Sequence, residues 1–196
     1  MTTATSTHQP LVDALWRTDS GILRPVALAV LGSLALWVSA KIQIPFYPVP
    51  MTMQTFVVLV IGMAYGWRLG AATVLLYLAE GALGLPVFAN TPERGIGLAY
   101  MMGPTGGFLI GFVLSAVLVG MLAERGWDRR LPTTLLAMTL GTAVIFACGL
   151  LWLGSLIGWD KPVLELGLLP FLPGAAFKIA LAAAVLPTVW KFTAGK

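Results

Sequence analysis

The sequence contains little charge and almost no histidine or cysteine. Charged residues make up 10% of its 196 positions, whereas about 25% is usual for a soluble domain. So few charges cannot cover a water-facing surface, which argues against an ordinary soluble domain. The single histidine, His8, and the single cysteine, Cys148, leave no intramolecular disulfide and no CxxC motif for metal or redox chemistry. We therefore expect no metal site and no cofactor.

The residues needed for catalysis within a membrane are also missing. A Ser–His pair would need a histidine in an apolar run, but His8 lies in the polar N-terminal segment. The zinc-protease motif HExxH is absent, and Glu80 is the only acid within an apolar run, so no carboxylate pair can form there. The sequence therefore predicts that the protein is not an enzyme. A channel would need a polar stripe along one helix, and no helix shows one.

Long apolar runs are what the sequence has in abundance. Hydrophobic residues make up 58% of the chain, and its mean hydropathy is +0.90. A helix needs roughly 20 apolar residues to cross a bilayer. We expect an all-α integral membrane protein, a compact bundle of six transmembrane helices forming one domain over residues 21–196, after a cytoplasmic N-terminal tail at 1–20. The six expected spans are 22–40, 55–66, 69–85, 104–123, 134–157 and 171–192.

The distribution of basic residues predicts the orientation of this bundle. The net charge of +4 comes from residues between apolar runs, and no basic patch with interleaved aromatics suggests nucleic acid. With the N-terminus inside, eight basic residues fall on the inside and three on the outside. The eight are Arg17, Arg24, Arg68, Arg125, Arg129, Arg130, Lys191 and Lys196, against Lys41, Arg94 and Lys161. This bias predicts a multi-pass membrane protein with both termini in the cytoplasm.

Lys178 is the most informative residue for function. It lies within the sixth expected span, where a charge costs about 2.5–3.5 kcal/mol and usually faces the bundle interior. Snorkelling to the surface is the alternative explanation. We favour a binding role because Gln54, Asn90, Arg94 and Tyr100 are expected at the same outer depth. Cations, amides and an apolar wall suit a pocket for a small anion.

Three of these four neighbours also have a purely structural interpretation. Asn90 is typical of a turn, Arg94 can be a solvated loop charge, and Tyr100 can anchor the membrane interface. Small residues four positions apart, Ala29 and Ser33, predict a close helix–helix contact. That contact is either internal or with a partner subunit. A GxxxG pattern at residues 107–111 predicts close packing of the fourth span.

Four motifs in order resemble those of the BioY family, the biotin-specific substrate-binding (S) components of energy-coupling factor (ECF) vitamin transporters. They are VPMTMQT at 49–55, EGALGLPVF at 80–88, YMMGPTGGFLIGF at 100–112 and PFLPGAAFK at 170–178. The resemblance covers nearly all of residues 22–192. It implies six helices, a pocket near the outer face and biotin as the ligand. It also implies docking onto a membrane coupling subunit driven by two ATPases, although solitary or homo-oligomeric transport is an alternative.

The resemblance assigns roles within the pocket. Lys178 and Arg94 are expected to neutralise the biotin carboxylate, Asn90 and Gln54 to bind its polar ends, and Tyr100 with Phe88 to pack on its apolar part. The family usually carries an acid three positions before the lysine, where this chain has Ala175. Residues three apart share a helix face, so a partner of Lys178 is missing. The alternatives are the same scaffold with another vitamin or small anion, or a subunit that transports nothing.

Overall fold

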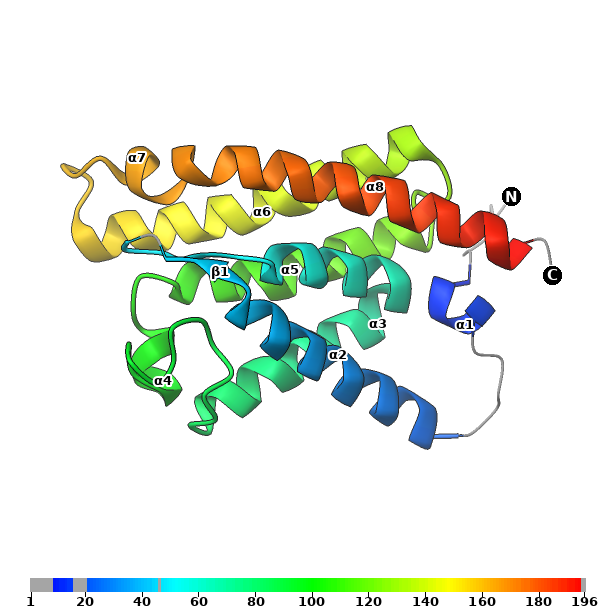
Figure 1. The fold of residues 1–196 in the computed structure, drawn as a ribbon, viewed down its shortest axis with the longest axis horizontal. Helices are drawn as coiled ribbons and strands as arrows, with labels where there is room; N and C mark the ends of the chain where they lie inside the picture. The colour runs from blue at the N-terminus through cyan, green and yellow to red at the C-terminus, as the bar shows by residue number, and fades with distance from the viewer. Residues whose placement is uncertain (1–8, 16–20, 46, 195–196) are drawn as a thin grey trace, which may run out of the picture.

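The apolar runs of the chain form helices that pack side by side (Figure 1). The computed structural model describes residues 9–15, 21–45 and 47–194. The helices are α1 (Leu11–Leu15), α2 (Leu23–Lys41), α3 (Gln54–Ala82), α4 (Gly97–Met101), α5 (Gly106–Ala123), α6 (Leu131–Ile157), α7 (Val163–Gly167), the 3-10 turn η1 (Leu169–Phe171) and α8 (Leu172–Ala194). The prediction of an all-helical membrane protein is confirmed at this level. A hairpin of two short antiparallel strands, β1 (Gln43–Ile44) and β2 (Met51–Thr52), was not expected.

Five of the described helical segments are long and apolar enough to cross a membrane, against six expected spans. They are α2, α3, α5, α6 and residues 163–193, which contain α8. The difference arises in α3, which combines the second and third expected spans in a single element of 29 residues.

Gly66 divides α3 into two legs. Its φ of 76° and ψ of 173° are not helical, and this conformation is essentially restricted to glycine. A Cβ atom at Gly70 would lie 3.0 Å from the Cα of Gly62, whereas eight residues of a straight helix span about 12 Å. Residues 54–65 and 67–82 therefore run back along each other, as Figure 1 shows. The sequence predicted a connection at Trp67–Arg68, one residue beyond the actual turn.

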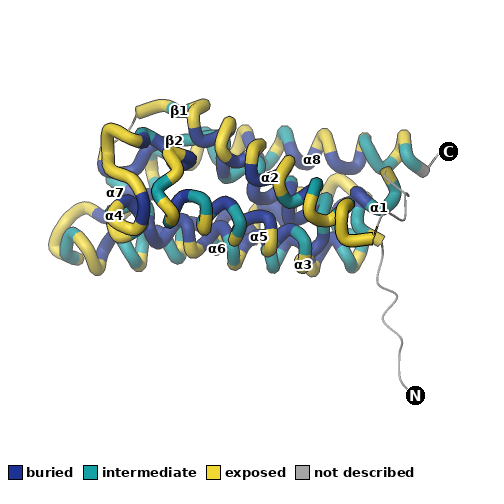
Figure 2. The backbone as a smooth tube through the Cα atoms, turned by 90° about the horizontal axis from the view of Figure 1, so that it is seen from below, coloured by how far each residue is buried: buried dark blue, intermediate teal, exposed yellow. Residues whose placement is uncertain are grey.

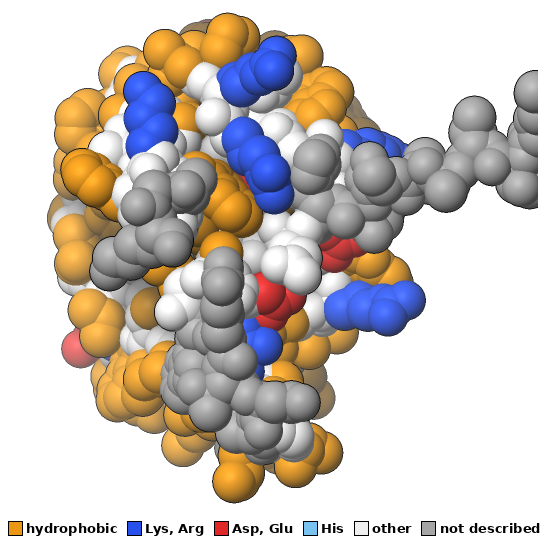
Figure 3. All heavy atoms as spheres, turned by 90° about the vertical axis from the view of Figure 1, so that its right-hand side faces the viewer, with side chains coloured by type: hydrophobic (Ala, Val, Ile, Leu, Met, Phe, Trp, Pro, Cys, Tyr) orange, Lys and Arg blue, Asp and Glu red, His pale blue; other side chains and the backbone are white. Residues whose placement is uncertain are grey.

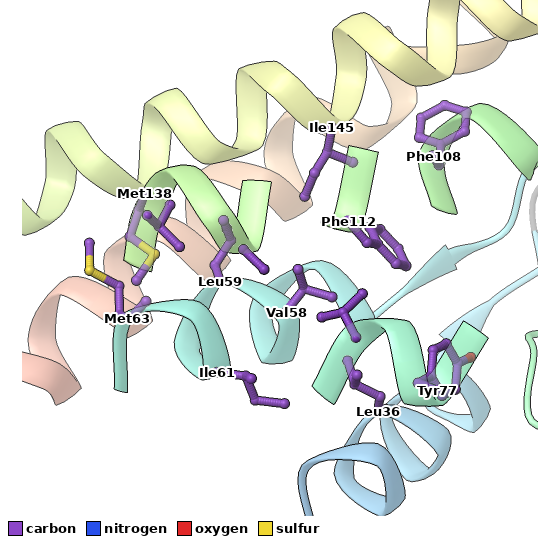
Figure 4. Close-up of a cluster of buried hydrophobic side chains, with 14 of the residues drawn as sticks. Leu36, Val58, Leu59, Ile61, Met63, Tyr77, Phe108, Phe112, Met138 and Ile145 are labelled. Carbon is purple, nitrogen blue, oxygen red and sulfur yellow. The ribbon is translucent and has the colours of Figure 1, made fainter. Parts of the chain in front are cut away.

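Glycines bring the central helices close together. A Cβ atom at Gly107 would lie 2.4 Å from the carbonyl oxygen of Cys148, and one at Gly111 would lie 2.8 Å from the Cα of Ile145. The predicted GxxxG contact is thus confirmed, with α6 as the partner of α5. Figure 4 shows the side chains that fill the resulting core, including Val58, Phe112 and Ile145. Figure 2 shows that buried positions follow the inner faces of the helices.

Large apolar side chains cover much of the outer surface. Val38 is 60% exposed, Leu151 63% and Phe177 64%. They belong to three different helices, α2, α6 and α8. Such a surface suits contact with lipid tails, since contiguous apolar patches of this extent are rare on soluble monomers.

The two ends of the bundle differ in charge. The α3 turn, the α5–α6 connection and the end of α8 lie at one end, together with α1 (Figure 1). Figure 3 looks at this end and shows several Lys and Arg side chains. Lys41, Arg94 and Lys161 belong to segments at the opposite end. His8, Arg17 and Lys196 lie outside the described residues, as does most of the expected tail at 1–20.

The described part of the N-terminal segment is packed against the bundle. Leu11 and Val12 of α1 are buried, at 3% and 8% exposure. The Arg24 guanidinium donates to the Asp13 carboxylate at 2.6 Å and to the Val12 carbonyl oxygen at 3.0 Å. These contacts tie α1 to the start of α2.

Candidate ligand-binding site

A cavity opens within the bundle at the end away from the termini. Segments far apart in sequence form its wall: the β2–α3 junction, the loop before α4, and the helices α5, α6 and α8. Most of the lining is apolar: Val49, Pro50, Leu59, Phe88, Ala89, Phe108, Leu109, Phe112, Ile145, Phe146, Phe171 and Ala175. The polar lining residues are Thr52, Gln54, Thr55, Tyr100, Thr105, Thr142 and Lys178. A mostly apolar pocket with a few converging polar groups is the usual form of a small-molecule site.

Among the described residues that line this wall, Lys178 is the only one with a charged side chain. The side chain is buried, at 9% exposure, and projects from α8 across to the start of α3. Its ammonium donates to the Thr52 carbonyl oxygen and, at 3.0 Å, to the Thr55 hydroxyl. None of the described residues that line the cavity is acidic. Because a buried charge is costly without a counter-charge, the cavity favours an anionic ligand.

Ala175 lies one helical turn before Lys178 and also lines the cavity. The position at which the resemblance leads us to expect an acid is therefore part of the cavity wall. The two oxygen atoms contributed by Thr52 and Thr55 occupy two of the three hydrogen-bonding directions of the ammonium. Both threonines belong to the motif at 49–55, but their contact with Lys178 was not predicted, because a contact across more than 120 residues cannot be read from local periodicity.

Gln54 begins α3 and is almost fully buried, at 4% exposure. Its side-chain amide donates to the Tyr77 hydroxyl at 2.6 Å, and that hydroxyl donates to the Val87 carbonyl oxygen at 2.9 Å. The Thr52 hydroxyl donates to the side-chain amide oxygen of Gln54 at 3.4 Å. Tyr77 comes from the second leg of α3, so the reversal at Gly66 is what places these side chains together.

Phe88 and Tyr100 form an aromatic wall. Their rings are stacked, with centroids 4.9 Å apart and an angle of 18° between planes. The phenyl ring of Phe88 occupies space that a side chain at Gly81 would need, since a Cβ there would lie 2.0 Å from it. Burial raises the pKa of the Tyr100 hydroxyl, against smaller opposing effects from a hydrogen bond with Thr105 and the charge of Arg94. The hydroxyl is therefore neutral in the physiological range.

The structure does not bring Asn90 and Arg94 to the cavity wall. Asn90 has a positive φ of 55°, and its side-chain oxygen accepts from Gln43 at 2.6 Å. Arg94 is exposed, donates to the Pro48 carbonyl oxygen at 3.2 Å, and lies 5.6 Å from the centre of the Tyr47 ring. Asn90 thus joins the loop before α4 to β1, and Arg94 joins it to the segment between β1 and β2. The positive φ of Asn90 and its bond to Gln43 favour its interpretation as a turn residue over a ligand contact.

Lys41 is a residue of the site region that the sequence did not single out. Its ammonium donates to the Phe88 carbonyl oxygen at 3.0 Å and to both the carbonyl and hydroxyl oxygens of Thr91 at 3.1 Å. These bonds attach the end of α2 to the turn that carries Phe88. The lysine therefore supports the aromatic wall without lining the cavity.

Ser33 forms a buried contact between two helices of the same chain, α2 and α3. It is 1% exposed and donates to the Glu80 carboxylate on the second leg of α3. A Cβ atom at the neighbouring Gly32 would lie 2.5 Å from the Thr73 side chain. Of the two interpretations of the small-residue pair, the internal contact is the one formed at Ser33. Ala29 is half-buried on the same helix.

Comparison with known proteins points to one family. The model of the BioY family matches residues 6–195 of the chain. A protein of Pyrococcus horikoshii described as a probable biotin transporter BioY is 36% identical over 159 residues, which are 81% of this chain and 91% of that protein. The biotin transporter BioY of Rhodobacter capsulatus is 36% identical over 183 residues, 84% of this chain and 93% of that protein. For the biotin transporter BioY of Thermotoga maritima the identity is 35% over 148 residues, 76% and 85% of the two chains.

The fold is also similar to a solved structure. That structure is the 2.1 Å crystal structure of the S-component for biotin from an ECF-type ABC transporter. The TM-score is 0.71, with 89% of this chain and 94% of the other covered. The two sequences are 22% identical, so this likeness concerns the fold alone.

Proposed function

Because the chain belongs to the BioY family, we propose that it is the biotin-binding membrane component of a biotin uptake system. Its relatives are described as biotin transporters, and its fold is that of an S-component. The protein binds and carries its ligand, and it catalyses no reaction of its own.

The cavity matches the chemistry of biotin. Biotin has a carboxylate, a polar ureido ring and an apolar portion formed by the thiolane ring and chain. In this proposal the buried Lys178 ammonium pairs with the carboxylate, and Gln54 bonds with the ureido ring; both residues line the cavity. The stacked rings of Phe88 and Tyr100 offer an apolar wall. The buried lysine on a wall without an acid is the observation that carries this proposal.

The absence of an acid at position 175 fits an anionic ligand. With Ala175 there, Lys178 is hydrogen-bonded only to neutral oxygen atoms of Thr52 and Thr55 among the contacts described. A ligand carboxylate would supply the counter-charge that the wall lacks. In this proposal the ligand carboxylate supplies the negative charge that an acid at position 175 would supply. Arg94 and Asn90 order the adjoining loop and do not contact the ligand.

For the membrane arrangement, we propose six crossings in the single domain at 21–196, with both termini in the cytoplasm. The two legs of α3 would each cross once, in opposite directions. The end with the α3 turn and the end of α8 carries several Lys and Arg side chains, which supports its cytoplasmic placement under the positive-inside rule. The apolar outer surface of α2, α6 and α8 would face lipid in the bacterial inner membrane.

The partners follow from the S-component fold. We propose that the chain docks onto an ECF coupling subunit whose two ATPases supply the energy, since the chain has no phosphate-binding GxxxxGK[ST] motif. Transport by the solitary or homo-oligomeric chain would be recognised by biotin uptake in cells that lack every coupling subunit.

Equilibrium binding of radiolabelled biotin to the purified protein in detergent tests the function. We expect the unaltered chain to bind, and Lys178→Ala to weaken binding at least tenfold, about the effect of removing one partner of a charged hydrogen bond. Lys161→Ala is the matched control, because Lys161 is a 59% exposed lysine at the same end of the bundle, paired with Asp160 at 3.4 Å. Failure of the folded, unaltered chain to bind biotin would overturn the proposal and direct the search to other small anionic vitamins.

A further inference from the structure

Tyr77 connects parts of the cavity wall without lining the cavity itself. It is fully buried on the second leg of α3 and contacts Gln54, Val87 and Phe88. Figure 4 shows it in the cluster of buried side chains to which Leu36 of α2 also belongs. We propose that Tyr77 is a positioning residue that fixes which end of the Gln54 amide is offered to the ligand. This inference rests on the proposed function and makes it more specific.

The direction of each hydrogen bond in this chain of contacts is determined. The Val87 carbonyl oxygen can only accept, so the single hydroxyl proton of Tyr77 points to it across 2.9 Å. Toward Gln54, the Tyr77 oxygen can then only accept. The group that faces it at 2.6 Å must therefore be the NH₂ of the Gln54 amide. This conclusion follows from the donors and acceptors and does not depend on how the amide oxygen and nitrogen are assigned.

The side-chain amide oxygen of Gln54 is consequently turned away from Tyr77. The Thr52 hydroxyl approaches it at 3.4 Å, longer than the 2.5–3.0 Å usual for O–H···O hydrogen bonds, so the oxygen retains capacity for a further donor. A ligand N–H group fits this acceptor. On another part of the wall, the Lys178 ammonium offers donors to an anion. The geometry therefore selects ligands that combine an N–H donor with a carboxylate, as an acid bearing a cyclic urea does.

Tyr77 also links the polar and apolar parts of the wall. Its ring meets that of Phe88 edge-to-face, with centroids 5.5 Å apart and an angle of 84°. Its hydroxyl binds the backbone of Val87, the residue directly before Phe88. Replacing Tyr77 by phenylalanine keeps the ring contact and removes only the hydroxyl. Without the hydroxyl, the Gln54 amide is free to rotate and present either end to the cavity.

Biotin binding to Tyr77→Phe tests this positioning role. We expect affinity to fall about tenfold, the scale of one misdirected hydrogen bond in a buried site. Tyr65→Phe is the matched control, since Tyr65 lies on the other leg of α3 near its turn and is not part of the cavity wall. It should leave biotin affinity unchanged.

A double-mutant cycle separates positioning from general packing. If Tyr77 acts through Gln54, the change Tyr77→Phe costs affinity in the unaltered chain but nothing further in a Gln54→Ala background. An equal loss in both backgrounds would show that Tyr77 acts on packing alone and would overturn the inference. Normal affinity of folded Tyr77→Phe would overturn it too.

A ligand-side measurement needs no change at Tyr77. Methylation of both ureido nitrogens of biotin removes its N–H donors. We expect this analogue to lose more affinity for the unaltered chain than for Gln54→Ala, because only the former offers the oriented acceptor. Equal losses would refute the inference while leaving biotin binding in place. If the unaltered chain bound no biotin, the proposed function would fail first, and this inference with it.

Discussion

The ammonium of Lys178 on α8 lies 3.0 Å from the hydroxyl of Thr55 on α3, 123 positions earlier in the chain. This contact joins two helices across the cavity and gives the buried charge a neutral partner. A hydrogen bond to a charged group contributes about 1.5–3 kcal/mol. Under the proposed function, this one side chain links the stability of the ligand-free protein to the binding of an anion.

Thr55→Val should destabilise the ligand-free protein by about 1–2 kcal/mol. Valine has about the size of threonine, but it removes the hydroxyl that accepts a hydrogen bond from Lys178. Saturating biotin should reduce this difference, since the ligand carboxylate becomes the partner of Lys178. Thermal unfolding in detergent, with and without biotin, measures both effects. Thr139→Val is the control, because the Thr139 hydroxyl is exposed and bonds within its own helix to Leu135. An equal loss with and without biotin would contradict the role assigned to Thr55.

Ala175→Asp should change the charge preference of the cavity. An acid one turn from Lys178 supplies an internal counter-charge, so the ligand carboxylate becomes less important. We expect the ratio of affinities for biotin and its neutral amide to fall roughly tenfold relative to the unaltered chain. Ala175→Asn has a similar size without the charge and should keep the original ratio. The idea is wrong if Asp and Asn give the same ratio.

Gly66→Ala should lower stability without changing the site. The backbone at Gly66 is strained for any residue with a Cβ, which costs about 1–3 kcal/mol. A Cβ there would also lie 2.8 Å from the Glu124 carboxylate. We expect a lower unfolding temperature and a lower yield, while the folded fraction binds biotin with unaltered affinity because the turn lies at the other end of the bundle. Weakened binding by the folded fraction would show that the turn controls the cavity.

Cysteine labelling in intact cells tests the proposed six crossings. After Cys148 is replaced by serine, a membrane-impermeant maleimide should label Lys161→Cys and leave Arg68→Cys unlabelled until the membrane is opened. Arg129→Cys should behave as Arg68→Cys does, because both positions belong to the end that carries the termini. Labelling of Arg68→Cys from outside would rule out an inward-facing turn between the two legs of α3.

The sequence predicted the helices well because apolar length and glycine spacing are local signals. It also selected five residues that do line the cavity: Gln54, Phe88, Tyr100, Ala175 and Lys178. Each of them belongs to a motif of the family or lies next to one. Their individual contacts with a ligand remain predictions.

Local patterns could not reveal the parts of the site that depend on distant contacts. Asn90 and Arg94 lie in a loop, where no periodicity fixes side-chain direction, and both bond to the β1–β2 region instead of lining the wall. In the sequence, Lys41 resembles an ordinary charge at a helix end, because its bonds to Phe88 and Thr91 join segments far apart in the chain. Tyr77 looked like any aromatic residue of an apolar helix, because its role depends on the reversal at Gly66.

The reversal at Gly66 makes one helix supply two sides of the polar wall. Gln54 and Tyr77 lie near the two open ends of this U-shaped element and are hydrogen-bonded to each other. Lys178 belongs to α8, outside this U, and its hydrogen bonds to Thr52 and Thr55 join it to the first leg. A displacement of α8 relative to α3 would therefore break the contacts of Lys178 and leave the bond between Gln54 and Tyr77 intact.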